Sequence, residues 1–103
     1  MAQGYWVVSG DVFDPEGWKA YMAANAKAFG KYGGRFLVRG GKVEHAEGRL
    51  RSRIVVIAFP TYSAALECYR SPEYADAMRL REGKGVLDIA IVEGYDGPQP
   101  GEA

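Results

Sequence analysis

Two arginines in a short apolar segment are the residues of this chain whose type and spacing best suit ligand binding. Arg35 and Arg39 are four positions apart with Leu37 between them, so in a regular strand they share one face. A guanidinium group donates hydrogen bonds in a planar fork that suits a carboxylate or a phosphate. An ion pair with a neighbouring carboxylate, or exposure at a strand end, is the favoured interpretation, because arginine usually lies at protein surfaces.

Acid–base chemistry has two candidates, Asp11 and His45. Asp11 would serve as an acid or base if a subunit interface buried it, although a position in water at the strand end is preferred. His45 has the chemistry of a general base or an axial haem ligand. It is the only histidine and stands in a charged segment, and no second histidine or cysteine forms ligand spacing with it. A solvated position is therefore favoured for His45.

A pocket between helices and sheet would have polar and aromatic lining from both helical regions. Asn25 is the one polar member of an apolar stripe that recurs at helical spacing between residues 18 and 32. Tyr69 and Tyr74 flank a break in the second helical region and would line the opposite wall. Packing is the favoured role for these tyrosines, because aromatic residues at helical spacing usually belong to the core. We expect Tyr74 to pack beneath the break with its hydroxyl on water.

Composition and motifs exclude several functional classes. The 13 basic and 13 acidic residues give a net charge of zero, so no nucleic-acid partner and no membrane partner is expected. The chain has no cluster of metal ligands, no glycine-rich phosphate loop and no serine-centred nucleophile motif, so we expect neither a metal nor another cofactor. The sequence leaves open whether haem or flavin associates with the protein. A lone cysteine, Cys68, and no visible secretory signal are compatible with a reducing cytoplasm, where we expect the protein to act.

The elements that must position these residues follow from periodicity and capping. Asp14-Pro15, Thr61 and Ser71-Pro72 are typical helix starts, and Gly33-Gly34 is a typical helix end. These signals predict strands at 5–12, 35–39, 54–59 and 86–95, and helices at 15–32 and 61–81 with a break at 71.

The charged segment before the third strand is predicted to form a two-stranded ribbon at 42–46 and 49–53. With a turn at Glu47-Gly48, Glu44 would face Arg51 across the ribbon. Arg49, Arg51 and Arg53 alternate, so they would share one strand face. A solvated edge that discourages aggregation is the favoured interpretation of that face, and an anion-binding patch is the alternative.

The order of elements predicts an α+β fold, the ferredoxin-like βαββαβ sandwich, with a four-stranded antiparallel sheet and two helices on one face. Residues 54–59 are apolar at every position, so both faces of that strand need cover. The helices cover one face only. We therefore expect a homodimer packed through the open sheet face. Residues 1–96 form the expected domain and 97–103 a flexible tail.

Several short motifs resemble one family. They are Asp14-Pro15, the run from Tyr32 to Gly41, Phe59-Pro60-Thr61, the run from Tyr69 to Tyr74, and Val92-Glu93-Gly94. In combination they resemble the family known as domain of unknown function 1330, in the dimeric α/β-barrel superfamily, over about residues 5–95. The resemblance implies the ferredoxin-like fold and a dimeric α/β barrel. It brings no established activity and no catalytic residues.

These observations lead to two hypotheses of function. In the first, the protein binds or transforms a small organic molecule in a pocket between sheet and helices, with proton transfer or cofactor-free oxygenation as the chemistry. In the second, it is a non-catalytic dimeric binding or stress-related module. The sequence leaves open whether the protein is an enzyme. The candidate binding residues are Arg35, Arg39, Asp11, Asn25, Tyr69, Tyr74 and His45.

Overall fold

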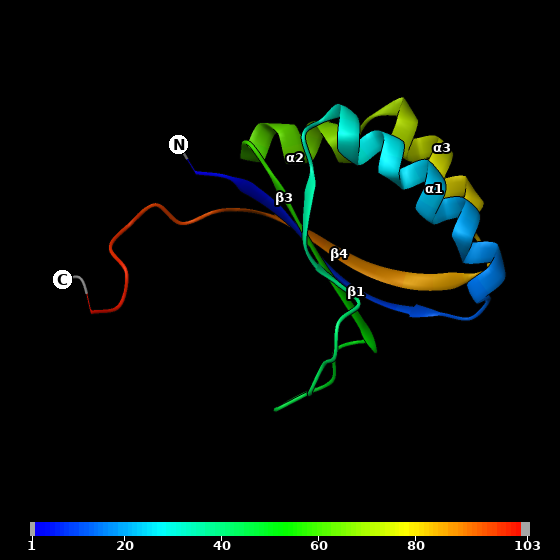
Figure 1. Cartoon of the computed structure of the whole chain (residues 1–103), viewed down its shortest axis with the longest axis horizontal. Coiled ribbons are helices and arrows are strands. Elements are labelled where there is room, and N and C mark those ends of the chain that lie inside the picture. The colour runs from blue at the N-terminus through cyan, green and yellow to red at the C-terminus, as the bar shows by residue number, and fades with distance from the viewer. Residues whose placement is uncertain (1, 102–103) are drawn as a thin grey trace.

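A computed structural model describes residues 2–101 of the chain. Seven elements follow one another in it: β1 Gly4–Val12, α1 Pro15–Lys31, β2 Arg35–Arg39, β3 Arg53–Phe59, α2 Tyr62–Tyr69, α3 Pro72–Leu80 and β4 Gly85–Glu93. All three helices lie on the same side of the sheet (Figure 1). The predicted order of strands and helices is confirmed, and the expected break divides the second helical region into α2 and α3.

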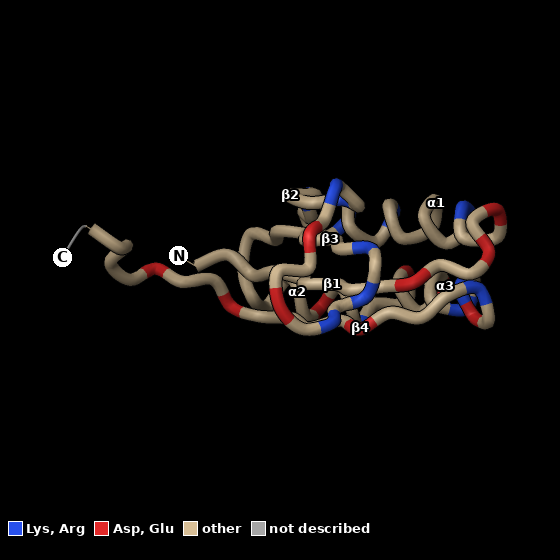
Figure 2. Tube along the Cα trace, turned by 90° about the horizontal axis from the view of Figure 1, so that it is seen from below, with Lys and Arg blue, Asp and Glu red and all other residues tan. Residues whose placement is uncertain are grey.

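The four strands form one antiparallel sheet in the order β2-β3-β1-β4. Figure 2 views this sheet from below, and the strand labels follow one another in that order. β1 and β3 are central, so each has hydrogen-bonded neighbours on both sides. This is the ferredoxin-like arrangement that the sequence predicts.

Each helix starts where a short polar side chain accepts a hydrogen bond from a backbone N–H of the first turn. Asp14 Oδ1 accepts from Gly17 N at 3.0 Å, Thr61 Oγ1 from Ala64 N at 3.0 Å, and Ser71 Oγ from Tyr74 N at 3.1 Å. Two of the three helices have proline at a first-turn position, where no donor is lost. These caps fix where α1 passes over the sheet.

Side chains alternate between the two faces of the sheet. Trp6 and Val8 of β1 point to the helices and are buried, whereas Val7 between them is 43% exposed on the open face. Trp6 is the centre of the core: its Nε1 donates to the Ala65 carbonyl at 2.9 Å, and its ring meets Phe29 edge-on at 5.1 Å. The core of the protein therefore lies between the helices and the sheet.

The predicted ribbon at 42–53 is wrong. Residues 41–50 form no strand and every one of them is exposed, including the apolar Val43 and Leu50. The segment projects away from the sheet below β1 and β3 (Figure 1). Alternating charges also suit a solvated irregular segment, so the pattern could not discriminate between the two structures.

Arg51 contacts the sheet and does not face Glu44 across a ribbon. Its Nε donates to Asp88 Oδ2 at 2.8 Å and its Nη1 to Asp11 Oδ2 at 3.2 Å, while its backbone N–H donates to Ser9 Oγ at 2.6 Å. These contacts hold the end of the irregular segment against β1 and β4, immediately before β3 begins at Arg53.

Residues 94–101 follow β4 without regular secondary structure. One hydrogen bond, from Gly94 N to the Gln3 carbonyl at 2.7 Å, extends the contact between the two ends of the sheet. Residues 102–103 of the expected flexible tail lie outside the described residues.

Candidate functional site

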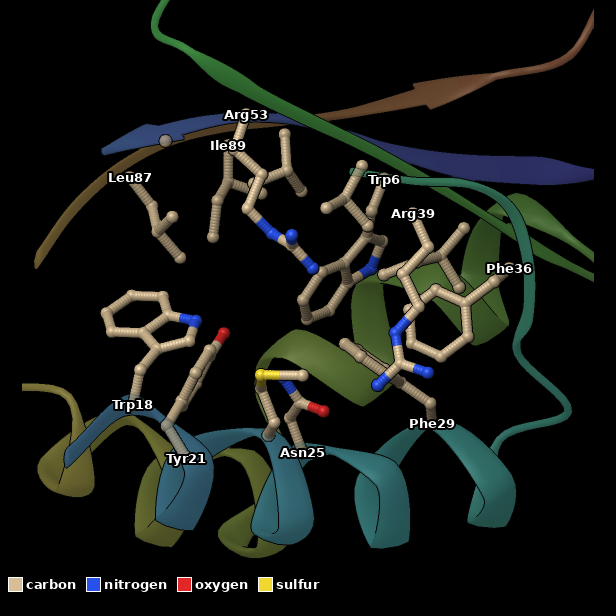
Figure 3. A pocket seen from close by; sticks show the side chains of 15 residues that line it. Trp6, Trp18, Tyr21, Asn25, Phe29, Phe36, Arg39, Arg53, Leu87 and Ile89 are labelled. Carbon is tan, nitrogen blue, oxygen red and sulfur yellow. The ribbon is translucent and has the colours of Figure 1, made fainter. Parts of the chain in front are cut away.

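A cavity lies between α1 and the helix-facing side of the sheet (Figure 3). Its empty volume, which includes the solvent space of the open mouth, is about 530 Å³. The lining is mostly aromatic and aliphatic and comes from all four strands and α1: Trp6, Val8, Gly10, Trp18, Tyr21, Met22, Asn25, Phe29, Phe36, Arg39, Arg53, Val55, Ile57, Leu87 and Ile89.

Asn25 is the polar side chain that α1 supplies to this cavity. It is 8% exposed, and its Oδ1 has no hydrogen-bond partner among the described residues. A buried amide oxygen without a partner costs roughly 1–3 kcal/mol of stability. Helical periodicity predicted its position on the buried stripe, and Figure 3 shows it projecting from α1 toward the sheet.

Arg39 lies in the cavity wall, and Arg35 does not. The register places Arg35 opposite Ala58 and Phe36 opposite Ile57, then shifts so that Val38 is opposite Val56 and Arg39 opposite Val55. The irregularity falls at Leu37 and adds one residue to β2, as a β-bulge does. Arg39 therefore faces the helices and Arg35 faces the open side. The prediction that the two arginines share a face is wrong.

The Arg39 guanidinium lies over the ring of Phe36, with Cζ 4.4 Å from the ring centroid. Such cation–π stacking favours arginine and keeps its planar fork oriented. No acidic side chain pairs with Arg39 in the part of the chain that the structure describes.

Arg53 is a site residue that the sequence analysis missed. It begins β3 opposite Gly10 and faces the helices together with Val55 and Ile57. A side chain at residue 40 would collide with its guanidinium, so Gly40, at φ +66°, leaves room for it. Strand alternation could have found Arg53, because it is two positions before the partly buried Val55 and four before the buried Ile57 and so takes the same face.

The two candidate tyrosines, Tyr69 and Tyr74, do not line the cavity but pack against residues that do. Tyr74 is completely buried, and its hydroxyl shares a hydrogen bond of 2.7 Å with that of Tyr21, which does line the cavity. Burial, and then the neighbouring Tyr21, raises the pKa of Tyr74 far above its ordinary value, so this hydroxyl stays protonated. The expectation that this hydroxyl meets water is therefore wrong. Tyr69 is partly exposed, and its ring packs on Trp6 and Tyr74.

Asp11 and His45 lie outside the cavity. The Ser52 backbone N–H, then the Ser52 hydroxyl, with Arg51 adding to them, lower the pKa of Asp11 below its ordinary value. Asp11 is therefore a structural acceptor on the open face and is not simply solvated at a strand end. His45 is exposed in the irregular segment. The Cys68 thiol is completely buried, and burial raises its pKa to about 12, which makes it a poor nucleophile at neutral pH.

The cavity thus combines stacking surfaces, two guanidinium groups and one amide, without a histidine, cysteine, serine or carboxylate in its lining. It is suited to binding and orienting a ligand more than to attacking one. Residues 2–101 contain no group of three or more side chains placed to hold a metal ion. Within the same range, no helix is long and apolar enough to cross a membrane.

Comparison with known proteins adds a family and a fold. The model of the family described as "Domain of unknown function (DUF1330)" matches residues 3–95. No curated protein matches the sequence.

Solved structures with the same fold have very different sequences. A protein of unknown function from Rhodopseudomonas palustris is 14% identical, with a TM-score of 0.68 over 93% of this chain and 85% of its own. SnoaB, a cofactor-independent oxygenase from Streptomyces nogalater, is 15% identical, with a TM-score of 0.62 over 97% and 99%. An ethyl tert-butyl ether d (ethd) family protein from Bacillus halodurans is 12% identical, with a TM-score of 0.55 over 92% and 100%.

Proposed function

This chain belongs to the DUF1330 family, and from the cavity itself we propose that it binds or transforms a small organic molecule between α1 and the sheet. The observation that carries the proposal is Asn25. A buried amide oxygen with no partner is costly to keep in a core, and a ligand that donates a hydrogen bond to it offsets that cost. The apolar walls with a few polar groups among them are typical of small-molecule sites.

Two forms of this function differ in whether the protein does chemistry. The lining lacks a nucleophile, and its one tyrosine hydroxyl, on Tyr21, is engaged with Tyr74. A non-catalytic binding module is therefore the second candidate. In cofactor-free oxygenation a bound substrate anion reacts with dioxygen itself. This chemistry requires no nucleophilic side chain from the protein. The fold shared with SnoaB, a cofactor-independent oxygenase, is an analogy in its favour and carries no residue assignment.

A homodimer through the open sheet face is part of the proposal. Three apolar side chains of the open face, Val7, Val38 and Val92, are 43%, 41% and 47% exposed, because no helix of the chain covers that face. A second sheet packed on this face would bury them. A reducing cytoplasm is the proposed setting, since Cys68 is a free buried thiol.

Ligand screening with a blocked cavity tests the central proposal. The purified full chain is screened by thermal shift against small aromatic and aliphatic compounds, and hits are measured by calorimetry. Val55→Phe places a larger side chain in the cavity wall, and Val43→Phe makes the same change on the exposed segment. We expect hits to bind the wild type and Val43→Phe but not Val55→Phe. Equal binding by all three proteins would place the ligand elsewhere.

Oxygen uptake separates the two forms of the function. Each hit is incubated with the protein in air, and dissolved oxygen is followed with an electrode. Uptake that Val55→Phe abolishes supports an oxygenase, whereas ligand binding without turnover supports the binding module.

A further inference from the structure

Two guanidinium groups without counter-charges face the same cavity. Arg39 enters from β2 and Arg53 from β3, and Figure 3 shows both side chains pointing from the sheet toward α1. Neither arginine side chain makes an ion pair or a hydrogen bond with another described residue. This contrasts with Arg51, which is bonded to Asp11 and Asp88 on the open face.

The charge of the cavity is therefore positive and uncompensated. No aspartate or glutamate belongs to the lining, and the other polar groups there are the indoles, the Tyr21 hydroxyl and the Asn25 amide, which are all uncharged. Arg53 is partly shielded from water, whereas Arg39 is exposed, and positive charges that lack a counter-ion favour an anionic occupant. Guanidinium forks match the two oxygens of a carboxylate better than they match a compact cation or a neutral group.

The walls restrict the shape of that anion. Trp6, Trp18, Tyr21 and Phe29 present aromatic rings around the space that Asn25 enters from α1. Aromatic faces and edges pack best on flat, unsaturated ligands. The Asn25 Oδ1 can accept a hydrogen bond from a donor, such as a hydroxyl or amine, on the body of the ligand.

We propose that the occupant is a planar aromatic carboxylate. Arg39 and Arg53 bind its carboxylate group, and aromatic side chains stack along its body. The Asn25 Oδ1 accepts a hydrogen bond from a hydroxyl group on its ring. This inference rests on the proposed function and names the ligand class for the same cavity. It assigns Arg53 and Phe36 to the site in addition to the residues predicted from sequence: Arg53 binds the anion, and Phe36 orients Arg39 from beneath.

Matched pairs of ligands that differ only in charge test the inference. Isothermal titration of the full chain compares benzoate with benzamide, 2-naphthoate with 2-naphthamide, and 3-hydroxy-2-naphthoate with its amide. Inorganic phosphate is included as a compact anion. Arg39→Met and Arg53→Met remove each charge while keeping an apolar side chain. Arg49→Met makes the same change at an exposed position away from the cavity.

We expect each carboxylate to bind at least about tenfold more tightly than its amide, the size of one charge-assisted hydrogen bond. Arg39→Met and Arg53→Met should each remove about that factor for carboxylates and leave amide binding within about twofold, and Arg49→Met should change neither. Phe36→Leu should weaken carboxylate binding less than Arg39→Met does, because the charge remains.

The outcomes separate this inference from the proposed function. Amides that bind as tightly as carboxylates, or carboxylate affinities that survive both arginine substitutions, would overturn the anion inference and leave the cavity as a neutral-ligand site. Phosphate binding that matches the carboxylates would also overturn it, because the aromatic body would then contribute nothing. If no member of either series binds at millimolar concentration and Val55→Phe changes no ligand in the wider screen, the proposed function falls as well.

Discussion

The hydroxyl oxygens of Tyr21 and Tyr74 lie 2.7 Å apart in the protein interior, where their hydrogen bond joins α1 to α3. Both residues are at least 95% buried, and each hydroxyl has the other as its hydrogen-bond partner. The pair fixes the part of α1 that carries the cavity wall, since Tyr21 itself belongs to the lining.

Removing one hydroxyl of this pair should lower the free energy of unfolding by more than half of the amount that is lost when both hydroxyls are removed. Tyr74→Phe leaves the Tyr21 hydroxyl buried without a partner, and we expect it to lower the free energy of unfolding by about 1–3 kcal/mol. Tyr21→Phe should act in the same direction. The double variant should cost less than the sum of the two single variants, because no hydroxyl is then left unpaired. Urea unfolding at one protein concentration measures the cycle, and strict additivity would show that the two groups do not interact.

The Asp11 carboxylate should make stability depend on pH in the acid range. Hydrogen bonds from Ser52 and Arg51 lower the folded-state pKa of Asp11 from its ordinary value of 3.8. A lowered pKa means that the contribution is present above the unfolded value and is lost as the pH falls toward the folded value. We therefore expect the melting temperature of the wild type to exceed that of Asp11→Asn above about pH 5, and the two to converge below about pH 4.

The matched control for Asp11 is Asp96→Asn, which removes the same charge at an exposed residue after β4. Its melting temperature should follow that of the wild type across the pH range. A constant gap between wild type and Asp11→Asn down to about pH 3 would mean that Asp11 carries no proton-linked stability.

Asn25→Leu should stabilise the empty protein and weaken ligand binding. The leucine side chain has a similar volume and leaves no buried polar group unpaired, so we expect the free energy of unfolding to rise by about 1 kcal/mol. Hydroxylated carboxylates should lose more affinity than their unhydroxylated parents. Chemical unfolding and calorimetry check the two effects, and a destabilised variant would show that the amide already has a partner in solution, such as a bound water.

Arg35→Met should leave carboxylate binding unchanged, whereas Arg39→Met should weaken it by about tenfold. The two residues are four positions apart, but the bulge at Leu37 turns them to opposite faces of the sheet. Calorimetry with 2-naphthoate measures the difference. Equal losses in the two variants would mean that β2 is regular in solution and that both arginines face the ligand.

A charge on the open face should convert the proposed dimer into monomers. Val7 pairs with Val56 and Ala90 at the middle of that face, so Val7→Glu would place a carboxylate at the centre of the interface. Light scattering should give twice the chain mass of 11.3 kDa for the wild type and the single mass for Val7→Glu. Ala26→Glu, on the exposed side of α1, is the control and should stay dimeric. A monomeric wild type at micromolar concentration would contradict the proposed assembly.

The sequence predicts the elements of this fold well because their ends carry chemical signals. Asp14, Thr61 and Ser71 cap the helices where they were expected to, and the five residues of β2 are placed correctly. Asn25 was correctly placed on the buried stripe because helical periodicity determines which face a residue takes.

The cavity was harder to predict because its residues depend on register and tertiary contacts. Nothing in the types of residues 35–39 marks a bulge, so the face of Arg39 could not be read from the sequence. Arg53 was assigned to a charged ribbon with Arg49 and Arg51, since alternation alone cannot tell where an exposed segment ends and a strand begins. Tyr74 was expected to reach water, and only its contact with Tyr21, 53 positions away, shows otherwise.

The bulge at Leu37 also has an evolutionary consequence. Because the side chains of β2 are divided between two environments, the edge strand carries two sets of positions that can be substituted independently. Substitutions at Phe36 and Arg39 bear on what enters the cavity, whereas substitutions at Arg35 and Val38 bear on what meets the open face. The proposed ligand site and the proposed dimer face can therefore change independently of each other.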